Sequence, residues 1–219
     1  NQFREAITAS LKSTDLVSRA YAIRELGARW GRIDPQSALA FAQTLDNSSQ
    51  RSVVIEGILS GWAEVDPTAA TAWAMQLPTG QLRGKALSAV ASTIASQDPQ
   101  AANTLMNSLP SGYLRFNMIL PVFGKWAGSS PTDAAAAALQ LTGDERYHAV
   151  STVANVWAVQ DFEAAFSWAQ SLPSGAVRDE AIKSIILTSD DEDIQMLTAW
   201  VGKHSSDPDL SEVVSGLAD

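Results

Sequence analysis

The chain has 219 residues, of which 46% are hydrophobic and 18% are charged, a composition too apolar for a disordered chain. Its formal net charge of −9, without a cluster of basic residues, argues against binding to nucleic-acid phosphates. Cysteine is absent, which excludes disulfides, thiolate metal sites and a cysteine nucleophile, and no apolar run approaches the roughly 20 residues of a membrane-spanning helix.

An Asp-Pro dipeptide recurs along the chain and marks internal repeats. It occurs in steps of 32 residues at Asp34-Pro35, Asp66-Pro67 and Asp98-Pro99. Degenerate copies follow at Ser130-Pro131, Asp161-Phe162 and Asp193-Ile194. A fixed period of this length is typical of tandem-repeat proteins. The sequence predicts repeats at about residues 3–33, 34–65, 66–97, 98–129, 130–160 and 161–192, with a partial cap at 193–219.

Each repeat opens with the signals of a short helix. Asp fits the N-cap, and Pro fits the first turn, where its missing N–H costs nothing. Apolar residues follow at helical spacing, as at Ala70, Trp73 and Ala74. A Leu-Pro pair then ends the helix, because the residue before Pro disfavours helical dihedrals. These pairs are Leu77-Pro78, Leu109-Pro110 and Leu172-Pro173. We predict a helix of about three turns in each repeat.

A second, longer helix follows in each repeat. Its predicted N-caps occupy one column, with Gly143 as the exception: Asp15, Asn47, Thr79, Ser111 and Ser174. An apolar stripe then runs for four to five turns, as at Ile55, Ile58, Leu59 and Trp62. Pro121 falls inside the fourth of these helices and predicts a kink that changes the local curvature.

Neither helix of a repeat can bury its apolar stripe alone, whereas stacked hairpins bury all the stripes. The sequence therefore predicts an all-α protein, a right-handed α-α superhelix (solenoid) of six to seven hairpins that forms a single domain over residues 1–219. The seven tryptophans continue the apolar stripes, which favours a place in the core over a stacking platform for ligands.

The repeat follows the pattern W-A-x-x-D-P-x-A-A-x-x-W-A-x-x-L-P-x-G-x-x-R, as in Trp62-Ala63, Asp66-Pro67, Trp73-Ala74, Gly80 and Arg83. In this respect the chain resembles the TPR- and HEAT-like α-helical repeat families, and more closely a class of uncharacterised bacterial proteins with this pattern. It departs from the TPR consensus in its period, 32 against about 34, and in lacking a Gly-x-x-Tyr pair. The resemblance implies a helical-repeat architecture and protein partners, and it supplies no catalytic residue.

An arginine column recurs near the start of each long helix, at Arg19, Arg51, Arg83, Arg115, Arg146 and Arg178. One interpretation is a ladder of guanidinium groups that grips an anionic ligand or an acidic partner. The other is structural: each Arg folds back onto the carbonyls that end the preceding helix, or pairs with the Asp N-cap of a neighbouring repeat. We favour the structural interpretation, since every repeat carries the residue.

A polar face of the long helices, opposite the apolar stripe, is the candidate partner-binding face. It comprises Lys85, Ser88, Ser92, Asn117, Lys125, His148, Ser151 and Asn155. His148, His204 and the acidic run 190–193 do not have the spacing of metal ligands, so neither a metal nor another cofactor is expected.

The favoured function is a non-catalytic scaffold that binds another protein or a peptide, as a monomer or weak dimer. Two alternatives stay open: a structural spacer within a longer chain, and an α/α-toroid enzyme acting on glycans. The start at Asn-Gln-Phe-Arg, without Met, leads us to expect a removed leader or a fragment. The absence of cysteine favours an extracytoplasmic, periplasmic compartment.

Overall fold

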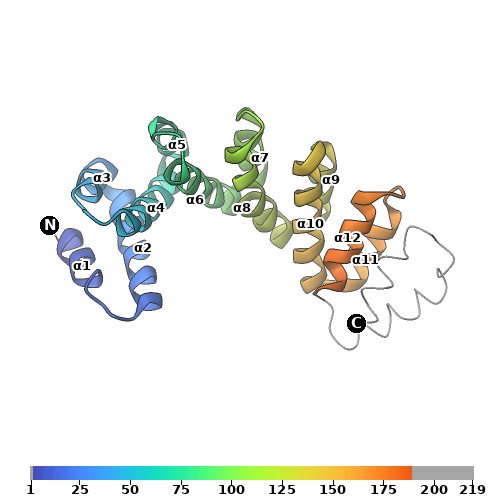
Figure 1. The fold of residues 1–219 in the computed structure, drawn as a ribbon, viewed down its shortest axis with the longest axis horizontal. Helices are drawn as coiled ribbons and strands as arrows, with labels where there is room; N and C mark the ends of the chain where they lie inside the picture. The colour runs from blue at the N-terminus through green and yellow to red at the C-terminus, as the bar shows by residue number, and fades with distance from the viewer. Residues whose placement is uncertain (1, 189–219) are drawn as a thin grey trace. The chain divides into compact units, whose positions relative to one another are not determined.

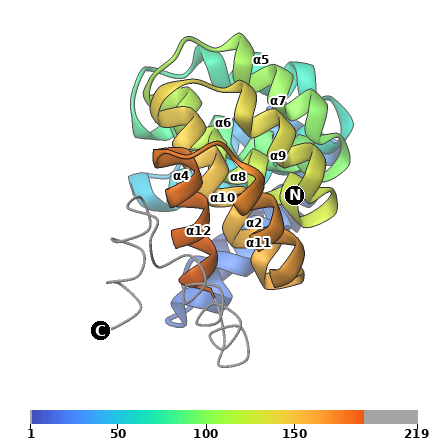
Figure 2. The same cartoon turned by 90° about the vertical axis from the view of Figure 1, so that its right-hand side faces the viewer.

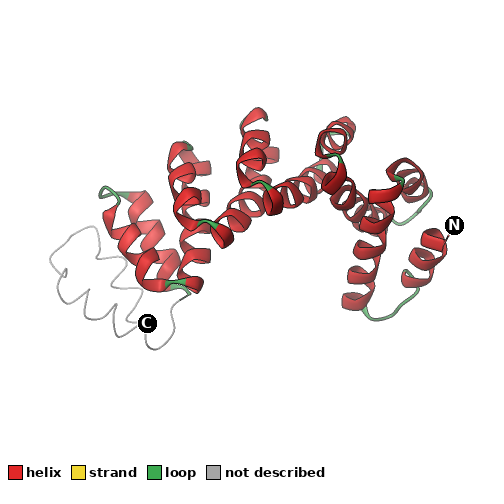
Figure 3. Cartoon of the chain, turned by 180° about the vertical axis from the view of Figure 1, so that it is seen from behind, coloured by secondary structure: helices red, strands yellow, loops and turns green. Residues whose placement is uncertain are grey.

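The computed structural model describes residues 2–188, and within them it contains twelve helices and no strand (Figure 3). The predicted all-α class is therefore confirmed. The chain divides into two compact units between Val122 and Phe123, inside one helix. The predicted features at His204, Trp200, residues 190–193 and the terminal cap lie outside the described residues.

The N-terminal unit alternates short and long helices (Figure 1). Its helices are α1 (Gln2–Ser10), α2 (Leu16–Ile33), α3 (Pro35–Gln43), α4 (Ser48–Val65), α5 (Pro67–Gln76), α6 (Gln81–Gln97), α7 (Pro99–Ser108) and the first part of α8 (Tyr113–Ser129). The long helix α4 packs against α2 on one side and α6 on the other. The short helices α3, α5 and α7 each pack on the long helix next to them in the chain, so the long helices form one layer and the short helices another.

The C-terminal unit continues the alternation. It holds the end of α8, followed by α9 (Pro131–Gln140), α10 (Gly143–Gln160), α11 (Phe162–Ser171) and α12 (Ala176–Ile186). The long helix α10 contacts α9, α11 and α12, and α11 and α12 contact each other (Figure 2). Pro121 lies inside α8, which is one helix from Tyr113 to Ser129. The kink predicted there stays a prediction.

The short helices begin and end as predicted. Asp34, Asp66, Asp98 and Asp161 are N-caps whose carboxylates each accept a hydrogen bond from the main-chain N–H three residues later. The leucines of the Leu-Pro pairs are the C-caps. An Asp cap satisfies an otherwise unpaired donor and contributes about 0.5–2 kcal/mol to stability. These local signals therefore fix where α5, α7 and α11 lie in the sequence.

The predicted N-caps of the long helices are correct only in the first two cases. Asp15 and Asn47 accept hydrogen bonds from the N–H groups of Val17 and Gln50. Thr79 and Ser174 do not cap their helices. The caps are Gly80 and Gly175, without a side-chain bond and with φ of 144° and 135°. After a Leu-Pro stop the chain must reverse within a few residues, and this backbone conformation is accessible almost only to Gly.

The same turn precedes α8, where the predicted cap was Ser111. Gly112 has φ of 135°, and its carbonyl accepts the hydrogen bond from the N–H of Phe116. Before α10 the cap is Thr142, without a side-chain bond, and Gly143 is the first residue of the helix. The prediction placed the starts of α6, α8 and α12 one residue early, and that of α10 one residue late, because it weighed side-chain capping and missed the backbone conformation of the turn.

Tryptophans of the long helices lie in the core, as predicted. Trp30, Trp62, Trp126 and Trp157 are each at most 9% exposed. Those of the short helices, Trp73 and Trp168, are half-buried. Trp157 and Trp168 stack with ring centroids 5.5 Å apart. The aromatic columns therefore join the short and long helices through apolar contact, which is the largest favourable term in folding.

Four glycines on facing sides of α2 and α4 permit an unusually close helix contact. They form two i, i+4 pairs, Gly27 with Gly31 and Gly57 with Gly61, and all four are buried. A Cβ added to Gly61 would lie 1.9 Å from the Ala28 carbonyl oxygen, and one added to Gly31 would lie 2.1 Å from the Ile58 carbonyl oxygen. The two backbones therefore touch directly, without side chains between them.

Candidate functional site

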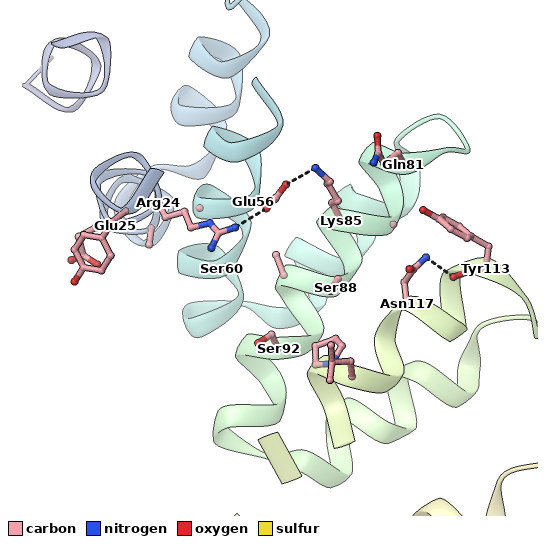
Figure 4. Close-up of a pocket in the computed structure, with 17 residues that line it drawn as sticks. Arg24, Glu25, Glu56, Ser60, Gln81, Lys85, Ser88, Ser92, Tyr113 and Asn117 are labelled. Atoms are coloured by element: carbon pink, nitrogen blue, oxygen red, sulfur yellow. Dashed lines mark hydrogen bonds and ion pairs between the residues drawn. The ribbon is translucent and has the colours of Figure 1, made fainter. Parts of the chain in front are cut away.

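A groove crosses the long helices of the N-terminal unit and encloses a cavity of about 820 Å³ (Figure 4). Its lining comes from α2, α4, α6 and α8, which are successive long helices of the chain. Because the apolar stripes of these helices face the short helices and one another, the opposite helix faces line the groove, with polar residues and with apolar ones such as Leu120 and Pro121. The main polar residues are Tyr21, Arg24, Glu56, Lys85, Tyr113 and Asn117.

The charges in the groove centre on Glu56. Its side chain is only 14% exposed, and it lies between Arg24 of α2 and Lys85 of α6 (Figure 4). The Arg24 Nη2 is 3.5 Å from one Glu56 oxygen and the Lys85 Nζ is 3.9 Å from the other. The Ser52 hydroxyl also donates to Glu56, at 3.0 Å. One carboxylate therefore faces three donor groups from three consecutive long helices.

Short polar side chains and tyrosine rings complete the groove. Ser60, Ser88 and Ser92 contribute hydroxyl groups to its lining. The Asn117 amide donates to the Tyr113 carbonyl at 2.7 Å, which leaves the Asn117 side-chain oxygen as an acceptor. Tyr21 and Tyr113, from helices at opposite ends of the series, are 74% and 61% exposed. The groove therefore offers both hydrogen-bonding groups and exposed aromatic surface.

The structure brings together half of the predicted binding face. Lys85, Ser88, Ser92 and Asn117 line the groove. The other predicted residues belong to the C-terminal unit and are not among its lining: Lys125, His148, Ser151 and Asn155. Lys125, His148 and Asn155 are exposed, whereas the Ser151 hydroxyl is 2.8 Å from that of Ser184.

The prediction missed the charged centre of the groove, Arg24 and Glu56, and the rim residue Tyr21. A signal for them existed in the sequence. Tyr21 lies two residues after a column arginine, as Lys85 and Asn117 do. Arg24 and Glu56 lie five residues after one, as Ser88 does. Extending these two columns into the first two repeats identifies all three residues.

The arginine column makes contacts away from the groove lining. Arg83 Nε donates to the Leu77 carbonyl at 2.6 Å, and Arg146 Nε donates to the Leu141 carbonyl at 2.5 Å. Both leucines are C-caps of the preceding short helix. Arg19 donates to the Ser13 carbonyl at 3.1 Å, and Arg178 lies 3.8 Å from Asp179. For Arg83 and Arg146 this is the structural arrangement in which the side chain closes the turn, and charge-assisted bonds of this kind are strong.

A second polar cluster joins α10 and α12 in the C-terminal unit. The Tyr147 hydroxyl donates to Glu180, and the Ser184 hydroxyl lies 3.5 Å from the other Glu180 oxygen. The hydrogen bond to Glu180 is the main cause that raises the pKa of Tyr147 to about 12, and burial and the Glu180 and Asp179 charges act in the same direction. Ionising Tyr147 would place a second negative charge against Glu180.

This cluster predicts a stability change at high pH. Because the folded protein holds the Tyr147 proton more tightly than the unfolded chain does, its contribution to stability is complete below pH about 10. That contribution is lost as the pH rises from about 10 to about 12. The phenolate absorbance should show an ionisation near pH 12 that Tyr147→Phe removes and Tyr21→Phe keeps. Identical curves for wild type and Tyr147→Phe would contradict the assignment.

The described residues lack the features of two other classes of site. Among residues 2–188 there is no group of three or more His, Cys, Asp or Glu side chains that could hold a metal ion. Within the same part of the chain no helix combines the length and the apolar character needed to cross a membrane. The sequence matches no protein-family model, no curated protein and no solved structure.

Proposed function

We propose that this protein is a non-catalytic helical-repeat scaffold that holds an extended segment of another protein in the groove of its N-terminal unit. The observation that carries the proposal is the groove itself, about 820 Å³ in volume and lined by four successive long helices. A site lined by equivalent residues of successive repeats can contact a ligand at regular intervals along its length, which suits an extended chain.

The proposal includes a repeated architecture, an α-solenoid of hairpins with a period of 32 residues. Two ion pairs join residues 32 apart on α2 and α4: Arg24 with Glu56 at 3.5 Å, and Arg32 with Glu64 at 2.6 Å. In the C-terminal unit the Gln160 amide donates to the Ala127 carbonyl, 33 residues earlier. Positions one repeat apart, or within two residues of it, therefore lie side by side on neighbouring long helices in each unit, which supports stacking of hairpins.

The lining chemistry favours a polypeptide ligand. An extended peptide carries unpaired main-chain donors and acceptors, and the hydroxyls of Ser60, Ser88 and Ser92 with the Asn117 oxygen can pair with both kinds. The exposed rings of Tyr21 and Tyr113 supply amphipathic contact area at a low cost in side-chain entropy. The helices beneath are fixed by buried contacts such as the α2–α4 glycine pairs, so binding does not require the groove to be ordered first.

The proposal is tested by selecting binders to the 219-residue chain from a random peptide library and measuring the affinity of a synthetic selected peptide. Ser88→Trp fills the groove and should weaken that peptide at least about 10-fold, since bulk there displaces the ligand. Thr104→Trp, on the exposed face of α7, is the matched control and should bind as wild type does.

Hydrogen exchange with the peptide bound should show added protection in α2, α4, α6 and α8. Failure to select any peptide whose binding Ser88→Trp blocks would overturn the proposal. In that case a structural spacer within a longer chain becomes the better explanation of these packed helices.

A further inference from the structure

The cations of the groove are less fully engaged than its carboxylates. Glu56 accepts a hydrogen bond from the Ser52 hydroxyl at 3.0 Å and also faces the two cations. The second carboxylate of the groove, Glu25, forms an ion pair with Arg29 at 2.8 Å. Arg24 and Lys85 reach Glu56 only at 3.5 and 3.9 Å, longer than the about 2.7–2.9 Å of a strong charge-assisted bond. Their side chains are 64% and 47% exposed, and exposed pairs at such distances contribute little to stability.

The donor capacity of the two cations also exceeds what Glu56 can use. An Arg guanidinium has five N–H donors and a Lys ammonium has three, whereas Glu56 already accepts from three groups. Arg24 and Lys85 come from α2 and α6, on either side of α4, so they face each other across the groove (Figure 4). An anion placed between them, above Glu56, would meet donors from both sides.

We infer that the segment held in the groove places the carboxylate of an Asp or Glu side chain between Arg24 and Lys85, so that the partner is an acidic extended peptide. This inference rests on the proposed function. The incoming carboxylate competes with Glu56 for the two cations, which move from their long contacts with Glu56 to shorter ones with the ligand. Glu56 retains Ser52 and holds the cations in place when the groove is empty.

Because Glu56 competes with the ligand, a substitution of Glu56 should strengthen peptide binding, whereas a substitution that merely disrupted the groove would weaken it. Glu56→Gln removes the competing charge while keeping the side-chain size and an acceptor for Ser52. If the ligand is anionic, this variant binds the selected peptide more tightly, by about 3- to 10-fold, because both cations are released to it. If the ligand instead used Glu56 to hold a cationic side chain, the same variant would lose binding.

The experiment uses the selected synthetic peptide, a second peptide with its Asp and Glu replaced by Asn and Gln, and the full chain. Arg24→Gln with Lys85→Gln should weaken the acidic peptide by about 10- to 100-fold and leave the amide peptide nearly unchanged. Arg32→Gln, on the same helix, is the matched control and should bind as wild type does, because neither Arg32 nor its partner Glu64 lines the groove. Thermal unfolding of each variant shows that it is folded.

The outcomes separate the two proposals. Selected peptides rich in Asp and Glu, bound more tightly by Glu56→Gln and more weakly by the double variant, support the inference. The inference is overturned if the selected peptides lose binding to Ser88→Trp but lack acidic residues, or if they bind more weakly to Glu56→Gln. The proposed function would still stand in either case. A selection without any groove-binding peptide overturns the proposed function and the inference with it.

Discussion

Replacing Gly61 by alanine is expected to lower the free energy of unfolding of the N-terminal unit by about 3 kcal/mol. The new methyl group would lie 1.9 Å from the carbonyl oxygen of Ala28 and 2.5 Å from its carbonyl carbon. Both are backbone atoms of α2, so no side chain can rotate away, and the two helices must move apart. That movement separates the apolar side chains around the contact, which outweighs the about 1 kcal/mol that Ala gains over Gly in a helix.

The other glycines of the contact give a graded series. The nearest atom to an added Cβ is at 2.1 Å for Gly31, 2.7 Å for Gly57 and 3.2 Å for Gly27. The loss of stability should therefore decrease from Gly61 through Gly31 and Gly57 to Gly27, where the neighbours need to yield by only a few tenths of an ångström. Urea unfolding, with hydrogen exchange of α2 and α4 to localise the effect, measures the series.

Gly128 is the matched control for this series. It lies in α8, and a Cβ added to it would meet nothing within 4 Å. Gly128→Ala should stabilise the protein by up to about 1 kcal/mol through helix propensity alone. If Gly61→Ala behaves like Gly128→Ala, the two helices do not touch as closely as the structure places them.

Local signals of one or two residues were enough to place the helices. An Asp that caps a helix, or a Leu that precedes Pro, acts through its own main chain, so Asp66 and Leu77 bound α5 in the structure as in the prediction. Thr79 failed as a cap because a geometric demand of the turn, met by Gly80 with φ of 144°, overrode a side-chain preference. Such a demand depends on where two helices must point, which a single position does not reveal.

The close contact of α2 and α4 has a sequence signal, two pairs of glycines, that the search for a repeat did not detect. Gly27 and Gly31, like Gly57 and Gly61, are four residues apart and share one helix face. The pattern recurs in the first two predicted repeats but at different positions, since a period of 32 aligns Gly27 and Gly31 with Leu59 and Ala63, and Gly57 and Gly61 with Ala89 and Thr93. A search for features common to all repeats therefore passes over it, although the glycines set the spacing of two helices that line the groove.

The groove was predictable in part for the same reason. Its polar residues follow columns of the predicted repeat, so Lys85, Ser88 and Asn117 were found from the face they share. Arg24 and Glu56 were missed because the meaning of their charges depends on which helices are neighbours. Only the fold shows that Glu56 of α4 lies between a cation from α2 and one from α6.

Replacing Trp30 by alanine is expected to cost about 3–5 kcal/mol and to release α1 from the rest of its unit. Trp30 is 3% exposed and lies between two rings, with the Phe3 centroid at 5.9 Å and the Phe41 centroid at 5.6 Å. The nine-residue α1 buries only Ile7 fully, and the Phe3–Trp30 stack is a main part of its attachment to α2. A helix this short is marginal in isolation, so α1 depends on that attachment.

Two measurements distinguish release of α1 from a general loss of stability in Trp30→Ala. Hydrogen exchange should show amides of residues 2–10 exchanging far faster under conditions in which α4 stays protected. Trp73→Ala, at a half-buried position of α5, is the control and should cost less while leaving α1 protected. If α1 kept its protection in Trp30→Ala, the burial of Ile7 and the contact of Arg4 with the Phe41 ring would have to hold it without the ring stack. Trp30 would then matter mainly for the packing of α2 against α3, through its contact with the Phe41 ring.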